Sequence, residues 1–187
     1  MSNIEEIIEN TKERMSKSVD SLQRDLGGIR TGRASASLVE NINVEYYGAQ
    51  TPLNQLSSIS VPEARTIVIQ PWDKEALDEI AKGILKSDLG ITPNSDGTII
   101  RINVPELTEE RRKEMVKIVG NMVEEGHVAI RNIRRDSLEK IRTLDKDKEI
   151  SQDDGRRAQQ ELQTVTDSFI SEMDSIKSQK EKEVMEV

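Results

Sequence analysis

The stretch "EERRKEMVKIVGNMVEEGHVAIRNIRRDSLEKIRTL" (residues 109–144) repeats its apolar residues every three or four positions and contains no proline. This spacing places the apolar side chains along one stripe of an α-helix. Thr108 precedes the stretch as an N-cap, and Glu109 and Glu110 suit the positive end of the helix dipole. The stretch therefore predicts a single helix on the order of 55 Å long.

Gly126 and Ser137 occupy two positions of the apolar stripe in this helix. A glycine there either lets a neighbouring element approach the backbone closely or softens the helix. The sequence does not distinguish these two roles.

Two further segments have the same helical period. The first runs from Ser2 to about Ile29 and ends among the glycines of "LGGIRTG" (26–32). The second begins at Ser151, which forms a capping-box-like start with Asp154. None of the three helices can bury its apolar stripe alone, so together they predict a long antiparallel three-helix bundle.

The residues between the first two helices have a different composition. Residues 34–104 hold four of the five prolines, the tryptophan and both tyrosines. Composition and period predict strands at residues 41–48, 59–61, 65–71 and 98–104, a helix at 74–90 and a turn at 92–97. The fold class is therefore α+β, with a small α/β domain, mostly β, inserted between helices one and two.

The domain boundaries follow from these patterns. We predict that residues 1–31 and 105–187 form the bundle and that residues 32–104 form the inserted domain. The chain crosses between the two near residues 30–33 and near residues 104–106. A double connection permits bending but not free tumbling, so we predict a hinge there. Its residues are Arg30, Thr31, Gly32, Pro105 and Glu106.

The composition excludes several classes of protein. The chain has no cysteine, which removes disulfides, thiolate metal sites and cysteine nucleophiles and suits a reducing cytosol. Its first residues are acidic and lack the apolar core of a signal peptide, and no run of about eighteen apolar residues occurs. We therefore predict a cytoplasmic protein that makes no membrane contact.

Side chains able to perform catalysis or bind metal do not form a recognisable site. His127 is the only histidine, and we predict that it is exposed among basic neighbours. "DKDKEISQDDG" (145–155) resembles a calcium loop, but Ile150 replaces the required glycine and Arg156 the required glutamate. The sequence also lacks a phosphate-binding or dinucleotide-binding glycine motif. We predict no enzymatic activity, no catalytic residue, no metal site and no cofactor.

The aromatic residues of the inserted domain are the other candidates for binding. Tyr46 and Tyr47 are adjacent in a predicted strand, so their rings are expected on opposite faces. At most one of them can then join a base-stacking platform. Trp72 follows Pro71 and is expected to cover the core of the small domain.

A row of arginines lies on one face of the predicted long helix, although the chain has a formal net charge of −8. At about 100° per residue, four of them fall within an arc of about 100°. These are Arg131, Arg134, Arg135 and Arg142. The acidic residues between them in the sequence project outside this arginine arc. Guanidinium groups suit phosphate oxygens because they donate parallel hydrogen bonds.

Two interpretations of the arginine arc are open. It is a solvated face with ion pairs to the flanking Asp136 and Glu139, or it is a docking edge for RNA. Arg30 and Arg33 near the predicted hinge and "ERRK" (110–113) add positive charge. We favour RNA, because the acidic remainder of the surface repels a polyanion and leaves this edge to dock.

Six motifs occur in series along nearly the whole chain and together resemble those of bacterial-type ribosome recycling factors. They are "IRTGRAS" (29–35), "VEYYG" (44–48), "SDLG" with "PNSDG" (87–97), "LTEERRK" (107–113), "RNIRRD" (131–136) and "DKEIS" (147–151).

The resemblance implies an L-shaped molecule with a tRNA-like outline that binds RNA of the large ribosomal subunit after termination. Arg131, Arg134 and Arg135 correspond to the RNA-contacting arginines of the family, and Arg30 and Arg33 match its pattern. The implied partner is elongation factor G, which hydrolyses GTP while the two factors separate the subunits. The protein itself is then expected to be a monomer.

A competing hypothesis is a non-catalytic helical adaptor whose arginines bind an acidic patch on a protein partner. An adaptor should expose an apolar seam and self-associate, whereas a recycling factor should be a monomer whose binding falls steeply with salt. A nuclease ranks third, because the chain lacks a nucleophile–base or metal constellation.

Overall fold

The computed structural model describes residues 3–186 and confirms the mixed α+β class. The chain divides into two compact units. One comprises the residues up to Gln23 together with Lys117–Lys182, and the other comprises Arg24–Val116 together with the residues from Glu183 onward. Among residues 3–186, no helix combines the length and the apolarity needed to cross a lipid bilayer.

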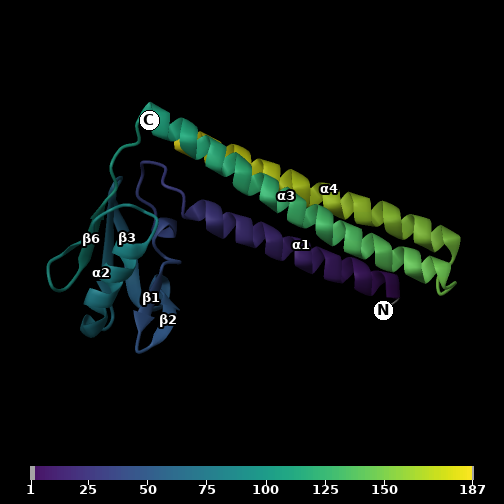
Figure 1. Cartoon of the computed structure of the whole chain (residues 1–187), viewed down its shortest axis with the longest axis horizontal. Coiled ribbons are helices and arrows are strands. Elements are labelled where there is room, and N and C mark those ends of the chain that lie inside the picture. Colours follow the sequence, from purple (N-terminus) through teal and green to yellow (C-terminus); the bar gives the residue numbers. More distant parts are fainter. Residues whose placement is uncertain (1–2, 187) are drawn as a thin grey trace. The chain divides into compact units, whose positions relative to one another are not determined.

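Three long helices carry the predicted apolar stripes. They are α1 (Asn3–Gly27), α3 (Glu109–Lys146) and α4 (Gln152–Met185) (Figure 1). The expected first residue of α1, Ser2, lies outside the described residues. Thr108 and Ser151 cap α3 and α4 as predicted, because their hydroxyl oxygens accept from Arg111 N at 3.2 Å and from Asp154 N at 3.1 Å.

The three helices pack as an antiparallel bundle, as predicted. One core cluster joins Ile8 of α1, Ile141 of α3 and Leu162 of α4. Further along, Leu22 of α1 and Met173 of α4 meet at Gly126 of α3. Residue numbers rise along α1 and α4 while they fall along α3, so α3 runs against the other two helices.

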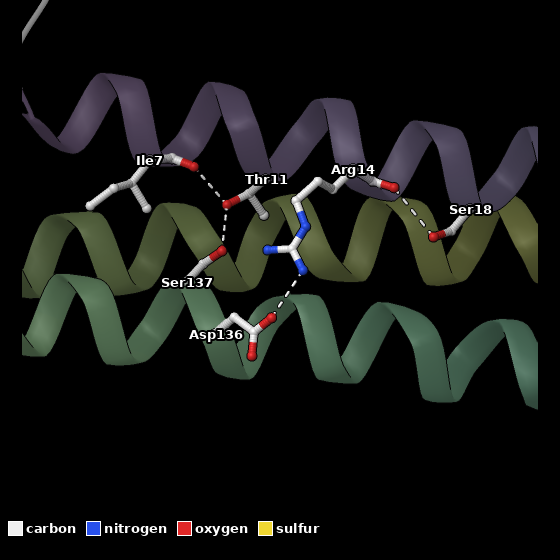
Figure 2. A network of polar contacts seen from close by, with 6 residues as sticks. All are labelled: Ile7, Thr11, Arg14, Ser18, Asp136 and Ser137. Atoms are coloured by element: carbon white, nitrogen blue, oxygen red, sulfur yellow. Dashed lines mark hydrogen bonds and ion pairs between the residues drawn. The ribbon is translucent and has the colours of Figure 1, made fainter.

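Two polar side chains are buried inside this bundle. Thr11 and Ser137 are 0% and 2% exposed. Thr11 Oγ1 donates to the Ile7 carbonyl at 2.7 Å and lies 2.6 Å from Ser137 Oγ (Figure 2). Because the Thr11 proton is already used, Ser137 donates in the second bond. An unpaired buried hydroxyl costs about 1–3 kcal/mol, so this pair opposes a shift of α1 along α3.

An ion pair lies beside the buried hydroxyls at the bundle surface. Arg14 Nη2 is 2.9 Å from Asp136 Oδ2, with both side chains substantially exposed (Figure 2). An exposed pair of this kind contributes at most about 1 kcal/mol. The flanking acid Asp136 is therefore engaged by α1 rather than by the arginine arc.

The small domain contains two antiparallel sheets and one helix. β1 (Asn43–Tyr46) pairs with β2 (Ala49–Pro52). The second sheet has the order β3-β4-β6-β5. Its strands are β3 (Ser57–Glu63), β4 (Thr66–Pro71), β5 (Asn94–Ser95) and β6 (Ile100–Asn103). The helix α2 (Leu77–Lys86) follows a 3-10 turn at Lys74–Ala76 (Figure 1).

Aliphatic residues from both sheets and α2 form the core of this domain. The fully buried members of it are Val39, Val44, Leu53, Ile67, Ile69, Ile80, Ile84, Ile100 and Ile102. Gly83 lets α2 lie against β1, since a Cβ atom there would stand only 3.1 Å from Val44 Cγ2. Val44 is itself buried, so this contact has little room to relax.

The strand and turn predictions for the small domain were only partly correct. The four predicted strands are present as β1, β3, β4 and β6, but β2 and β5 were missed. β5 lies within the predicted turn at residues 92–97, where Asn94 and Ser95 pair with β6. The turn itself is held by the Asp96 carboxylate, which accepts from Thr98 N and Ile99 N. The helix predicted over residues 74–90 is shorter and ends at Lys86.

Candidate nucleic-acid interface

The packing of α3 determines which way the arginine arc faces. Ile130, Ser137 and Ile141 are buried in the bundle, with exposures of 2% or less. The arginines occupy other positions around the same helix. Arg131, Arg135 and Arg142 are exposed, and Arg134 is half-buried.

The four arginines differ in their partners. Arg131 Nη2 donates to Glu124 Oε1 at 2.7 Å. Arg134 Nε donates to Gln163 Oε1 of α4 at 3.0 Å. Arg135 and Arg142 have no hydrogen-bond or ion-pair partner among residues 3–186. The arc therefore presents two free guanidinium groups and two held ones, which is a surface able to bind several phosphate groups.

Glu124 is an acidic partner of the arginine arc that the helical pattern of residues 131–142 does not include. It precedes Arg131 by two helical turns and so shares its face of α3, although it lies before the arc begins. The hydrogen bond from Arg131 lowers the pKa of Glu124, and His127 adds a smaller effect in the same direction. An incoming phosphate must therefore compete with this carboxylate for Arg131.

His127 differs from the prediction in both exposure and surroundings. Its side chain is only 17% exposed, and it lies between two carboxylates rather than among basic groups. Nδ1 is 3.5 Å from Glu124 Oε2, and Nε2 is 3.0 Å from Asp174 Oδ1 in a contact that lacks hydrogen-bond geometry. The prediction missed Glu124, which lies one turn before His127 on the same helix, and it could not include Asp174, because that residue comes from α4. Within residues 3–186, no group of three or more potential metal-ligating side chains assembles.

Arg30 and Arg33 lie in the other compact unit. Arg30 Nη1 donates to the Leu89 carbonyl at the long distance of 3.5 Å. Arg33 Nη1 lies 3.7 Å from Glu186 Oε2. Both contacts are weak enough for another anion to replace them, because neither combines a short distance with burial.

The predicted hinge residues make defined contacts within that same unit. Gly32 has φ +81°, a backbone conformation that favours glycine, and its missing Cβ would lie 3.5 Å from Leu107 N. Glu106 Oε1 pairs with Arg65 Nη1 at 2.8 Å, while Pro105 is exposed and Thr31 is half-buried. Whether these residues bend remains a prediction.

The aromatic residues of the small domain lie otherwise than predicted. Tyr47 is not in a strand but in the β1–β2 turn, with φ +47° followed by Gly48 at φ +78°. The turn brings the two tyrosine rings into an edge contact with centroids 4.5 Å apart. Trp72 is 69% exposed and does not cover the core. The tyrosines were expected on opposite faces because both were assigned to an extended strand, and that expectation was wrong. The expectation that Trp72 covers the core was also wrong, because its side chain points into solvent.

The tyrosine hydroxyl groups donate to neighbouring carboxylates. Tyr46 Oη donates to Asp73 Oδ2 at 2.7 Å, which raises the pKa of Tyr46 to about 12 and lowers the pKa of Asp73. Tyr47 Oη donates to Glu75 Oε2 at 3.2 Å, and this bond raises the pKa of Tyr47. The stabilising effect of the Tyr46 contact is therefore lost as pH rises through about 12 and as pH falls through the lowered pKa of Asp73.

We expect Asp73→Asn to bring the ionisation of Tyr46 back toward the ordinary tyrosine range, because the charged acceptor is gone while the side-chain size is kept. Ultraviolet titration of phenolate absorbance, with circular dichroism to verify folding, measures this shift. Glu75→Gln serves as the control, since it should move Tyr47 and leave Tyr46 almost unchanged. An unaltered Tyr46 titration in Asp73→Asn would contradict the assignment.

Comparison with known proteins gives consistent results across the chain. A sequence model described as "Ribosome recycling factor" matches residues 22–185. The ribosome-recycling factor of Bacillus velezensis is 55% identical over 182 residues, covering 97% of this chain and 98% of that protein. The protein of the same name from Bacillus subtilis strain 168 is 53% identical over the same length.

Solved structures agree with the sequence relatives. A solution structure of the ribosome recycling factor superposes with a TM-score of 0.79 at 42% identity and covers both chains completely. A second similar chain belongs to models of the T. thermophilus recycling factor and E. coli elongation factor G bound to the E. coli post-termination complex. It has a TM-score of 0.68 at 45% identity and covers 98% of this chain and 99% of its own.

Proposed function

The chain belongs to the ribosome recycling factor family, and from this premise we propose that it binds the large ribosomal subunit after termination. Together with elongation factor G and GTP, it promotes dissociation of the subunits and release of the ribosome from mRNA. Support for these partners comes from the similar chain in the post-termination complex with elongation factor G.

The observation that carries the proposal is the arginine arc on α3. Among residues 3–186, the guanidinium groups of Arg135 and Arg142 have no partner, and Arg134 uses only its Nε atom, in the contact with Gln163. These groups can bind ribosomal RNA phosphates while α3 is held from behind by the bundle core. We include Arg131, Arg30 and Arg33 in the RNA-binding set, with their present carboxylate or carbonyl partners exchanged for phosphate.

The proposed role of this chain is mechanical rather than catalytic. The GTPase partner hydrolyses GTP, and this chain acts as a cytoplasmic monomer without a cofactor. The stiff α3, with 38 residues, is on the order of 57 Å long and suits a lever. We propose that the small domain of residues 32–104 moves about residues 30–32 and 105–106 when elongation factor G acts on it.

The alternative of a helical adaptor has less support. An adaptor needs an exposed apolar seam, whereas the α3 seam is buried at Val119, Val123, Ile130 and Ile141. Single exposed apolar residues such as Val128 do not make a seam.

Co-sedimentation with purified large ribosomal subunits across a salt series tests the proposal. We expect the logarithm of the binding constant to fall linearly with the logarithm of salt concentration. The slope should be about −3 to −5, as for four to six neutralised phosphates. Absence of binding at low salt, or binding that is insensitive to salt, would refute the proposed RNA docking and favour the adaptor.

A further inference from the structure

Gln163 of α4 contacts the arginine arc from a neighbouring helix. Its Oε1 atom accepts from Arg134 Nε at 3.0 Å, and its Nε2 atom donates to Asp167 Oδ1 at 2.8 Å. Asp167 lies one helical turn further along α4. The three side chains form a continuous series from a carboxylate through a neutral amide to a guanidinium group.

Only one orientation of the Gln163 amide satisfies both neighbours. A guanidinium group can only donate hydrogen bonds, and a carboxylate can only accept them. The amide oxygen must therefore face Arg134, and the amide nitrogen must face Asp167. Rotation of the amide by 180° would break both bonds, so Asp167 holds Gln163 in the orientation that Arg134 requires.

The contact leaves the phosphate-binding edge of Arg134 free. It uses the Nε–H bond, while neither Nη atom of Arg134 has a partner among residues 3–186. Two Nη atoms can still donate to one phosphate group. Arg131 is different, because its Nη2 atom is already bound to the Glu124 carboxylate at 2.7 Å.

A neutral partner also preserves the charge that attracts RNA. A carboxylate at position 163 could accept from Arg134, but it could not donate to Asp167 and it would cancel the positive charge of Arg134. An amide restricts the guanidinium group without that cancellation, and ordering a long side chain before binding reduces the entropy lost on binding.

We propose that Gln163, held by Asp167, is a positioning residue that orients Arg134 for contact with a phosphate of ribosomal RNA. This inference rests on the proposed function, because it assumes that the arginine arc docks on RNA. It adds α4 to the docking edge, to which the sequence assigned only residues of α3 and the hinge region.

Binding of single variants to large ribosomal subunits gives the first test. We expect Gln163→Met to weaken binding about two- to tenfold, the range for leaving one long side chain unordered. Its salt slope should equal that of the original chain, because the number of cations is unchanged. Gln163→Glu should weaken binding and also reduce the slope by about one, because it neutralises Arg134.

The matched control is Gln160→Met. Gln160 is an exposed glutamine on the same helix whose side chain has no partner among residues 3–186. This variant should bind like the original chain, and the thermal midpoints of all variants should agree. Equal binding by Gln163→Met and the original chain would overturn the inference while leaving the proposed function intact.

A double-mutant cycle tests whether Gln163 acts through Arg134. At low salt, where Arg134→Ala still binds measurably, adding Gln163→Met should cause no further loss. The same two- to tenfold loss in both backgrounds would overturn the positioning role, because Gln163 would then act independently. If the original chain itself fails to bind, the proposed function fails and this inference fails with it.

Discussion

Reversing the charges of Arg135 and Arg142 together is expected to weaken binding to large ribosomal subunits about 100-fold or more. Both side chains are exposed and unpartnered among residues 3–186, so neither substitution removes a contact within the fold. A hydrogen bond to a charged group contributes about 1.5–3 kcal/mol. The free energies of two such contacts add, so the corresponding fold-losses in affinity multiply. The double variant Arg135→Glu/Arg142→Glu should also show a salt slope about two units shallower in co-sedimentation.

The control for this variant must change the net charge equally without touching the arginine arc. Lys140 lies on the opposite side of α3 from Arg131, and Lys86 is exposed on α2 of the small domain. Neither side chain has a hydrogen-bond or ion-pair partner within the described part of the chain, so Lys140→Glu/Lys86→Glu makes the same change of charge elsewhere. A comparable loss in both double variants would show that net charge, and not the arc, controls binding.

The sequence predicted the arc itself but not the contacts that modify it. Helical period alone relates Arg131, Arg134 and Arg135, because they share one helix. Gln163 reaches Arg134 from α4, and the register between two helices depends on packing that a single segment does not encode. Glu124 was accessible to the same periodicity argument, had it been extended two turns toward the start of α3.

The fold was predictable where apolar periodicity is long. The three long helices were found because each repeats its stripe over many turns, whereas β5, with two residues, has no period to detect. The turn at Tyr47 and Gly48 was missed because two successive positive φ angles placed a tyrosine where glycine or asparagine is usual. The predicted domain boundaries lie at residues 31/32 and 104/105. These boundaries and the hinge between the two domains remain predictions.

The role of Gly126, which the sequence left open, is assigned by its surroundings in the bundle. A Cβ atom at this position would lie 3.0 Å from Met173 Sδ and 3.5 Å from Leu22 Cδ2. Met173 is fully buried, so its side chain occupies the space that a side chain at position 126 would need. Gly126 therefore admits a close neighbour.

Substitutions at the contact between Gly126 and Met173 should lower the free energy of unfolding, whereas the same substitution at Gly120 should raise it. Met173→Ala should lower the free energy of unfolding by about 2–5 kcal/mol, because it leaves a cavity. Gly126→Leu should lower it by about 1–3 kcal/mol through overpacking. At Gly120 of the same helix a Cβ atom meets nothing within 4 Å, so Gly120→Leu should instead stabilise by up to about 1 kcal/mol through helix propensity.

Combining the two destabilising substitutions separates packing from backbone softness. In Met173→Ala/Gly126→Leu, the new leucine can occupy the space that Met173 vacates. The decrease in the free energy of unfolding, measured by urea denaturation, should therefore be smaller than the sum of the decreases in the two single variants. If Gly126 served only to soften α3, then Gly126→Leu would stabilise as Gly120→Leu does, and its effect would simply add to that of Met173→Ala. A positive shift in stability for Gly126→Leu would therefore reject the close-packing role, because a buried methionine cannot share its volume with a leucine side chain.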